Sequence, residues 1–261
     1  MRIRRLTAAV ATVLLTVTGA TTAAATHQPK PKPKPTIVLV HGAFADGGSW
    51  SEVTKKLQRD GYTVVSPAVP LRSIATDTEY LKGVLAGISG PKVLVGHSYG
   101  GALITELAGA ADVKSLVYVA AFVPQAGETI GALNAQFPGS EINETTTNTI
   151  TYPGGVDLVM KPDAFRWVFA ADLPSRQAAV LASSQRPVAA SVFTETVPAS
   201  APADLPKYAV IAGKDRAIAP AAERFMAKRA NAKVVEAPGA SHLVMLSEPS
   251  LVTHTIEQAA R

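Results

Sequence analysis

The sequence predicts an α/β fold, with a mostly parallel sheet of about six strands that is flanked by helices and interrupted by one long insertion. From Thr36 onward, short apolar runs rich in β-branched residues alternate with longer segments of helical periodicity. Most of the short runs are continuously apolar, which is typical of strands that helices cover on both faces. This alternation implies parallel strands joined by right-handed crossovers, and such sheets bind ligands beyond the carboxyl ends of their strands.

Residues 1–25, which precede this pattern, are typical of a secretory signal peptide. Residues 1–5 include three arginines, residues 6–20 are uncharged and rich in Ala, Val, Leu and Thr, and Ala23-Ala24-Ala25 offers small residues for cleavage. A membrane anchor is the alternative, but the apolar stretch has about 15 residues where a spanning helix needs about 20. We therefore expect a secreted, extracellular protein with no stable membrane anchor, and Arg4-Arg5 leaves the twin-arginine export route open.

Residues 26–35 form a Lys-Pro spacer. Its prolines cannot donate the hydrogen bonds of a helix or sheet, so we expect a stiff polyproline-like tether, which is either simply solvated or in contact with anionic polymers after export. Residues 1–35 hold six of the 25 basic residues and none of the 20 acidic ones, so the remainder has 19 basic against 20 acidic residues and a net charge of −1. The pI of about 9.4 therefore reflects the leader and spacer, and no nucleic-acid partner is expected.

The absence of cysteine excludes disulfides, cysteine nucleophiles and thiolate metal sites. No histidine pair has the spacing of a zinc site, so neither a metal nor a cofactor is expected. A single domain of about 225 residues is large enough to be stabilised by its hydrophobic core alone.

The α/β core is expected in two pieces, residues 36–124 and residues 207–261. Strands are expected at residues 36–40, 62–66, 92–95, 115–121, 208–212 and 233–236. Helices are expected between them, at residues 49–59, 77–86, 101–110, 220–230 and 249–260.

Residues 125–206 break this rhythm and show no clear buried strand. A polar, threonine-rich stretch at residues 144–151 precedes a set of apolar residues: Phe165, Trp167, Phe169, Leu173 and Phe193. An insertion of this length after one strand is typical of a cap that covers the carboxyl edge of the sheet and excludes water from a pocket. The alternative is a surface excursion with its own small core. The aromatic residues favour the cap, because they need an apolar surface to pack on.

The most informative motif lies at residues 96–101, which read Gly-His-Ser-Tyr-Gly-Gly. It follows the expected strand at residues 92–95 and precedes a helical pattern, so it occupies a sharp turn between the two. Such a turn holds a serine in a strained backbone conformation, and its glycines let neighbouring backbone pass close by. Chance matches to this motif occur, and the strand-turn-helix context is what favours Ser98 as a nucleophile.

A serine hydroxyl needs a general base, and the base needs an orienting carboxylate. Of the five histidines, only His242 follows a predicted strand on a loop that can reach back over the sheet, whereas His41 is expected to be a structural residue that hydrogen-bonds backbone. Asp215 follows the strand at residues 208–212, and its alternative role is that of a surface or N-cap aspartate. The chain order Ser98, Asp215, His242 is the one expected of a strand-turn-helix nucleophile with its acid and base.

Backbone N–H groups are expected to bind the oxyanion of the reaction. The N–H of Tyr99 follows the nucleophile at a helix N-terminus. The N–H of Ala43 lies in the turn after the first strand, where Gly42 allows close approach of the backbone. The side chains of Tyr99 and Ala43 are expected to shape the pocket rather than to catalyse.

With these motifs, the chain resembles the α/β-hydrolase superfamily over residues 36–261. Within it, the motifs are most similar to the group of plant methylesterases, salicylate-binding esterases and hydroxynitrile lyases, together with its bacterial relatives. The matching pieces are Val-Leu-Val-His-Gly-Ala at residues 38–43 with Gly48 and Trp50, residues 95–101, Val-Ala-Ala-Phe-Val-Pro at residues 119–124, residues 181–187, and the segment from Gly239 to Pro249 around His242.

The resemblance also indicates which of the reactions known in this superfamily the chain is expected to catalyse. Hydroxynitrile lyases of this group have a lysine after the catalytic histidine and a threonine after the first-strand histidine, whereas this chain has Leu243 and Gly42 there. Epoxide hydrolases and haloalkane dehalogenases have a carboxylate at the position of Ser98. The resemblance therefore implies an esterase. Ser241 departs from the pattern, because the plant enzymes have an acid before the histidine.

We expect a secreted serine hydrolase that cleaves small-molecule carboxylic esters through an acyl-enzyme. Gly42, Phe122, Leu243 and aromatic residues of the insertion, including Trp167, are expected to form an apolar substrate pocket. Two alternatives use the same fold: a ligand-binding protein with little turnover, and a cofactor-free enzyme for C–C bond cleavage or perhydrolysis on the same triad. The sequence carries no signal for an oligomeric state.

Overall fold

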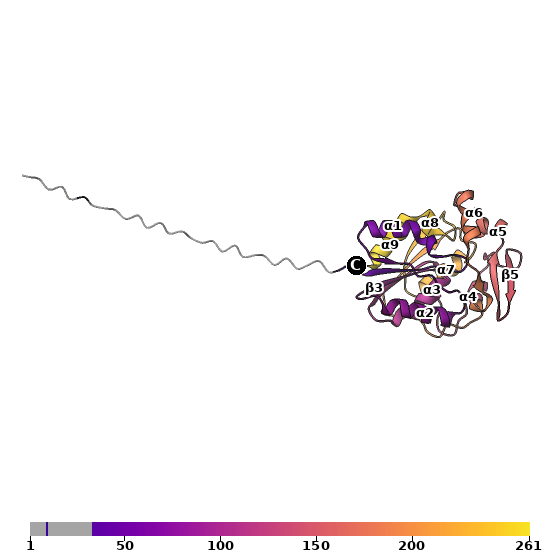
Figure 1. The fold of residues 1–261 in the computed structure, drawn as a ribbon, viewed down its shortest axis with the longest axis horizontal. Helices are drawn as coiled ribbons and strands as arrows, with labels where there is room; N and C mark the ends of the chain where they lie inside the picture. The colour runs from indigo at the N-terminus through magenta and orange to yellow at the C-terminus, as the bar shows by residue number, and fades with distance from the viewer. Residues whose placement is uncertain (1–8, 10–32) are drawn as a thin grey trace, which may run out of the picture. The chain divides into compact units, whose positions relative to one another are not determined.

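A parallel sheet of six strands, in the order β2-β1-β3-β4-β8-β9, forms the centre of the fold (Figure 1). Every pairing along it is parallel, which confirms the predicted fold class. The strands are β1 (Thr36–Val40), β2 (Val64–Val65), β3 (Lys92–Ser98), β4 (Val113–Ala121), β8 (Lys207–Ala212) and β9 (Lys233–Ala237). All residues of β3 and β8 are buried, which explains why these strands read as continuous apolar runs.

The structure is a computed structural model that describes residue 9 and residues 33–261. Residues 34–261 form one unit, and residues 1–33 are assigned to another. The expected signal peptide at residues 1–25 and most of the spacer at residues 26–35 lie outside the described residues. Within the described part, no helix is long and apolar enough to cross a membrane.

Helices cover both faces of the sheet. Figure 1 shows α1 (Ser51–Arg59), α8 (Val244–Ser247) and α9 (Pro249–Ala259) on one side, and α2 (Ile74–Ala86) and α3 (Tyr99–Glu106) on the other. Helix α7 (Pro220–Arg229) contacts β8, and short 3-10 helices, η1 (Gly47–Trp50) and η2 (Leu107–Gly109), precede α1 and follow α3. Local sequence sets several helix starts, because Ser73 caps α2 by accepting a hydrogen bond from the Thr76 N–H and proline opens α7 and α9.

The segment between β4 and β8 has secondary structure of its own. Its helices are α4 (Ile130–Ala135), α5 (Pro162–Phe169), α6 (Ser175–Ser184) and the 3-10 turn η3 (Ala190–Phe193). Three strands, β5 (Thr147–Tyr152), β6 (Gly155–Met160) and β7 (Val188–Ala189), form an antiparallel sheet that the sequence did not predict. In Figure 1, β5, α5 and α6 lie at the end of this unit opposite the C-terminus. We call residues 125–206 the inserted segment.

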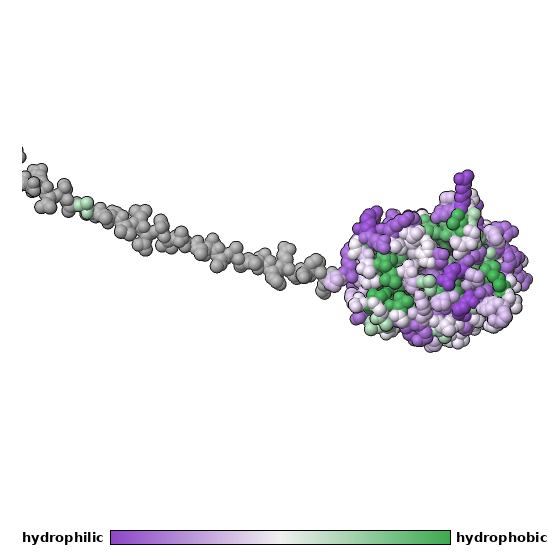
Figure 2. Space-filling model, viewed as in Figure 1, coloured by the Kyte–Doolittle hydropathy of each residue, from purple (hydrophilic) through white to green (hydrophobic). Residues whose placement is uncertain are grey.

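The surface of the described part is mixed. Figure 2 shows small separate hydrophobic areas among hydrophilic ones on the face in view. The exposed large apolar side chains include Ile150, Val156 and Val180 of the inserted segment. Scattered exposed apolar side chains of this kind are usual on monomeric proteins.

Candidate active site

Ser98 lies at the sharp turn between β3 and α3. Its φ of 53° and ψ of −122° are rare for a residue with a side chain, and they are the strained conformation expected of a nucleophile at such a turn. The residue is 6% exposed. The strand-turn-helix context predicted for Ser98 is confirmed.

The glycines of the motif are required by close backbone contacts. A Cβ on Gly96 would lie 2.5 Å from the Gly100 carbonyl oxygen, and a Cβ on Gly100 would lie 2.5 Å from that of Val40. A Cβ on Gly42, in the turn after β1, would lie 2.6 Å from Ser98 Cβ. Real Cβ atoms do not approach this closely, so the turn and the first-strand loop meet only because these residues lack side chains.

His242 and Asp215 form a buried pair. Nδ1 of His242 donates to Oδ2 of Asp215 at 2.6 Å, and both side chains are fully buried. The other carboxylate oxygen of Asp215 accepts from the backbone N–H groups of Ala217 and Ile218, at 2.6 and 3.0 Å. These three bonds fix the carboxylate and keep the hydrogen of His242 on Nδ1, so Nε2 is left as the basic nitrogen.

Nε2 of His242 is free to act. It is buried and has no hydrogen-bond partner within the described residues, and no bond there joins it to the Ser98 hydroxyl. The turn and the histidine loop nevertheless meet, because the rings of His97 and His242 lie 4.5 Å apart. Hydrogen bonds between nucleophile and base are commonly long in unliganded enzymes and tighten when substrate binds.

His97, the variable residue of the motif, contacts His242. Its Nε2 donates to the carbonyl oxygen of His242 at 3.0 Å, and its ring lies edge-on to Trp50. Burial, and then the neighbouring His242, lower the pKa of His97 well below its usual value, so the ring is neutral. The motif alone carried no signal for this role, because its second position accepts many residue types.

His41 orients the expected oxyanion turn. Its Nε2 accepts from the Val69 N–H at 3.0 Å, which leaves Nδ1 to donate to the Gly42 carbonyl oxygen at 2.9 Å. A trans peptide directs its C=O and N–H to opposite sides, so the Ala43 N–H points away from His41. No backbone hydrogen bond of the described residues uses the Ala43 N–H. The expectation that His41 is structural is confirmed.

Tyr99 begins α3, so its N–H has no partner inside the helix and is available to an oxyanion. Its side chain points elsewhere, because the hydroxyl donates to Oδ2 of Asp77 in α2 at 2.8 Å. Burial raises the pKa values of both Tyr99 and Asp77. The Tyr99 side chain therefore links α3 to α2.

A protein-family model described as "Alpha/beta hydrolase family" matches residues 37–254. The chain belongs to the α/β-hydrolase family. A carbendazim hydrolyzing esterase from Nocardioides sp. (strain SG-4G) is 34% identical over 111 residues, which cover 37% of this chain. The match spans 46% of the length of that relative.

Several solved structures superpose on this α/β hydrolase over most of its length. Polyneuridine aldehyde esterase superposes with a TM-score of 0.75 at 19% identity, over 88% of this chain and 100% of its own. A pyrethroid hydrolase from Sphingobium faniae JZ-2 gives 0.70 at 23% identity, over 87% and 97%. A methylesterase from Arabidopsis gives 0.71 at 17% identity, over 86% and 98%. At these identities the likeness establishes the fold.

The structure brings three of the four expected pocket residues to the catalytic groups. Gly42 lies against Ser98, and the Phe122 N–H donates to the Ser98 carbonyl oxygen at 3.2 Å. Leu243 is buried directly after His242. Trp167 lies elsewhere, because it is 38% exposed and its ring faces the Arg216 guanidinium at 5.7 Å.

Phe169 of α5 occupies the place that Trp167 was expected to share. Its ring lies edge-on to the His242 ring at 4.8 Å and contacts Phe44 at 5.7 Å. Phe165 stacks on Phe169, and a small cavity beside them is lined by Phe44, Phe165 and Leu243. The helical spacing of α5 explains the difference, since Phe165 and Phe169 are four residues apart on its buried face and Trp167 is on the opposite face.

A second carboxyl group lies behind the triad. Glu223 in the first turn of α7 is 2% exposed, and its Oε2 accepts from the Ala212 N–H at 3.2 Å. Burial, and then the nearby Asp215 carboxylate, raise the pKa of Glu223 well above its usual value. Both causes favour the neutral form of the Glu223 carboxyl group, and its Oε1 has no hydrogen-bond partner within the described residues. The sequence indicated no such role, because a glutamate in the first turn of a helix is normally an exposed residue that favours the helix dipole.

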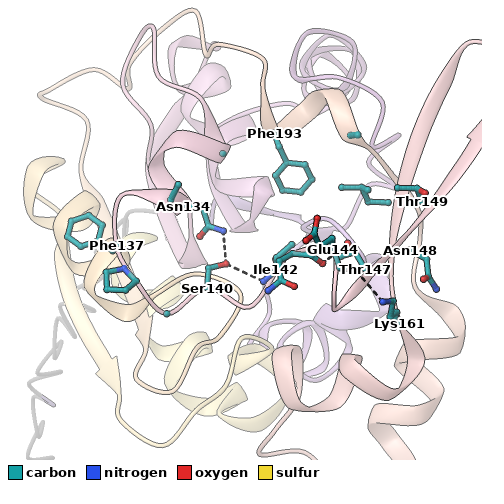
Figure 3. Close-up of a pocket in the computed structure, with 17 residues that line it drawn as sticks. Asn134, Phe137, Ser140, Ile142, Glu144, Thr147, Asn148, Thr149, Lys161 and Phe193 are labelled. Carbon is teal, nitrogen blue, oxygen red and sulfur yellow. Dashed lines mark hydrogen bonds between the residues drawn. The ribbon is translucent and has the colours of Figure 1, made fainter.

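A larger cavity of about 840 Å³ lies within the inserted segment, and no triad residue lines it. Figure 3 shows Phe193, Ile142 and Glu144 around its centre, with Asn134 and Ser140 hydrogen-bonded to each other at one side. The wall at Ser140 is attached to the loop that carries Asp215, because Ser140 Oγ donates to the Ala217 carbonyl oxygen at 2.8 Å. Among the described residues, no group of His, Cys, Asp and Glu side chains is arranged to hold a metal ion.

Proposed function

We propose that this α/β hydrolase cleaves small-molecule carboxylic esters through the triad Ser98, His242 and Asp215, with an acyl-enzyme intermediate. The observation that carries the proposal is the strained turn at Ser98 beside a buried His242–Asp215 pair whose Nε2 is unpartnered among the described residues. A free basic nitrogen next to a serine at a sharp turn is what proton abstraction from the hydroxyl requires.

In the first half-reaction, Ser98 Oγ attacks the ester carbonyl carbon while His242 Nε2 takes the hydroxyl proton. The backbone N–H groups of Ala43 and Tyr99 bind the oxyanion, and Asp215 stabilises the imidazolium through Nδ1. The tetrahedral intermediate collapses, the C–O bond breaks, and His242 returns the proton to the leaving alcohol. Water then attacks the acyl-enzyme by the same route and releases the acid and free Ser98.

The surroundings of the triad favour an apolar ester. The side chains of Phe44, Phe165, Phe169 and Leu243 lie near His242, and all are buried. An aromatic lining of this kind suits an aryl or short alkyl group, which gains free energy by leaving water. The names of the relatives agree with ester hydrolysis, since two are called esterases and one a methylesterase.

Substitution of the nucleophile tests the function. Ser98→Ala removes the attacking oxygen, and we expect kcat/KM for short p-nitrophenyl esters to fall by about 10⁴-fold or more with an unchanged circular dichroism spectrum. The matched control is Ser183→Ala, an exposed serine of α6, which should leave activity unchanged. Full activity of Ser98→Ala would overturn the assignment.

Covalent labelling separates this proposal from a ligand-binding protein of the same fold. A fluorophosphonate reacts with a serine only where a base and an oxyanion site activate it, so it should label the parent protein and spare Ser98→Ala. A parent protein that resists labelling would favour the binding protein. Carbon–carbon lyase or perhydrolase activity on the same triad would appear as labelling without ester turnover.

The sequence of residues 1–25 supports a proposal about location. A basic start, an uncharged apolar stretch and three consecutive alanines are the features that signal peptidases recognise, so we propose export of the enzyme to an extracellular location.

A further inference from the structure

The loop that carries His242 is hydrogen-bonded to the inserted segment on both sides of the histidine. Before it, the Ser241 N–H donates to Oδ2 of Asp172 at 3.1 Å, and the Ser241 hydroxyl donates to Oδ1 of the same carboxylate. After it, the Leu243 N–H donates to the Phe169 carbonyl oxygen at 3.0 Å. Both acceptors belong to the end of α5 and the loop that follows it.

These bonds complete the restraint of the catalytic histidine. Asp215 holds the ring at Nδ1, and His97 holds the His242 carbonyl oxygen. With these two bonds alone, the backbone of the whole loop could still shift. The hydrogen bonds that Asp172 and Phe169 accept from the loop oppose that shift. The Phe169 ring against the imidazole adds a packing contact from the same end of α5.

Asp172 has features that a surface aspartate does not need. It is exposed as a residue, yet both of its carboxylate oxygens face Ser241, which is 1% exposed. Within the described residues it forms no ion pair with lysine, arginine or histidine. A carboxylate that accepts both an N–H and an O–H from one residue forms two charge-assisted hydrogen bonds, which are the stronger kind. Its interactions are therefore directed at the histidine loop.

We propose that Asp172 is a positioning residue for the general base: its carboxylate holds Ser241 and thereby keeps His242 Nε2 directed at Ser98. The proposal rests on the proposed triad function. It makes the inserted segment part of the catalytic apparatus, because movement of the α5–α6 loop would carry His242 with it. Displacements of about 1 Å at a catalytic group can cost about 10²-fold in rate.

Asp172→Ala is the main test. We expect kcat for a p-nitrophenyl ester to fall by about 10- to 100-fold, because the loop loses both bonds, while KM stays within about twofold. Asp172→Asn keeps one acceptor and should recover part of kcat. The matched control is Asp163→Ala, an exposed aspartate of α5 that should leave kcat unchanged. A thermal melt of each variant shows that the loss is measured on folded protein.

Several outcomes would overturn the proposal. These are an unchanged kcat in Asp172→Ala, a loss equal to that of Asp163→Ala, and a rise in KM in place of the fall in kcat. Fluorophosphonate labelling distinguishes this failure from failure of the triad itself. If the parent protein is labelled and Asp172→Ala is labelled equally fast, only the positioning role is wrong. If the parent protein is not labelled, the proposed function is wrong as well.

Discussion

Two residues of the site have a backbone conformation that costs free energy. Ser98 has a φ of 53°, and Phe44, directly after the proposed oxyanion residue Ala43, has a φ of 57°. Each such residue costs on the order of 1–3 kcal/mol, which the surrounding contacts must offset. The Ser98 conformation belongs to the sharp turn between β3 and α3, and the Phe44 conformation belongs to the turn that carries the Ala43 N–H.

Gly42→Ala tests how closely these two turns must approach. The new Cβ would lie 2.6 Å from Ser98 Cβ and 3.0 Å from the His97 carbonyl oxygen, so one of the turns must move. We expect a folded protein whose kcat/KM is lower by about 10²-fold or more, because the Ala43 N–H no longer meets the oxyanion. Initial rates with a p-nitrophenyl ester give the measurement.

Gly83→Ala is the matched control for that substitution. Gly83 lies in the interior of α2 and is exposed, and a Cβ added there would have no other atom within 4 Å. Alanine at this position should stabilise the protein by about 0.5–1 kcal/mol and leave the rate unchanged. If Gly42→Ala retained the parent rate, the Ala43 N–H would not be an oxyanion donor.

Glu223 makes stability depend on pH. Its pKa is raised in the folded protein, whereas the unfolded chain releases this proton near the usual value of 4.5. The folded state therefore binds more protons than the unfolded state between the two pKa values, and stability falls as pH rises through that interval. Glutamine cannot ionise and is similar in size, so Glu223→Gln should escape the fall.

The measurement is Tm at pH 5 and at pH 8 for the parent protein and Glu223→Gln. We expect the Tm of the variant minus that of the parent to increase with pH, by about 2–4 °C for each kcal/mol gained, while kcat at pH 7 stays within about twofold. Glu144→Gln, at an exposed position, should show no such increase. If the Tm of the variant minus that of the parent decreased as pH rises, Glu223 would be ionised in the folded protein.

At the scale of elements, the sequence predicted the sheet and its helices well because burial on both faces leaves a direct mark on composition. The strand β1 was predicted with its observed bounds, and β9 was predicted to within one residue. The strand β3 runs three residues further than its apolar run, to Ser98, because the motif residues continue its pairing with β4. Backbone pairing of this kind leaves no hydrophobic signal.

The inserted segment was harder to predict for physical reasons. Five of the six residues of β5 are exposed, so this threonine-rich strand lacks the alternation that marks a half-buried strand. The contacts of His97 with His242 and of Glu223 with the Ala212 N–H depend on tertiary packing, and no local pattern encodes them. The sequence could single out Ser98, His242 and Asp215 as candidates because a fixed chain order and strand ends constrain them.

The inserted segment contacts the loops of both the acid and the base. Ser140 donates to the Ala217 carbonyl oxygen on the Asp215 loop, and Phe169 and Asp172 accept hydrogen bonds from the His242 loop. Two loops that leave different strands of the sheet are thus held by one segment. These contacts support the loops that bring His242 Nδ1 and Asp215 Oδ2 to 2.6 Å of each other.

In the molecule as a whole, the excess positive charge and the proposed catalytic residues lie in different parts of the chain. The positive charge of the chain resides in its first 35 residues, while the remaining 226 residues carry 19 basic and 20 acidic side chains. The hydrophobic core and the proposed catalytic residues all lie between Thr36 and Arg261. At that N-terminal edge, Lys34 donates to the Asp60 carbonyl oxygen and lies over the Tyr62 ring.

Removal of residues 1–33 should therefore leave the enzyme intact and change only its charge. The deletion removes five basic and no acidic residues, so the formal net charge falls from +5 to zero. We expect Tm and kcat/KM of the shortened protein to match those of the full chain within about 2 °C and twofold, since it retains Lys34 and every core contact. Retention on a cation-exchange resin at pH 7 should be lost, because most of the attraction to an anionic surface comes from clustered lysines and arginines.

A full-length variant with Lys30 and Lys32 replaced by glutamine separates the effect of charge from that of chain length. It should lose part of the retention and keep full activity. A large fall in kcat/KM on deletion would show that the leader or spacer contributes to activity, whereas unchanged kcat/KM with lost retention would show that residues 1–33 supply the attraction to an anionic surface without contributing to catalysis.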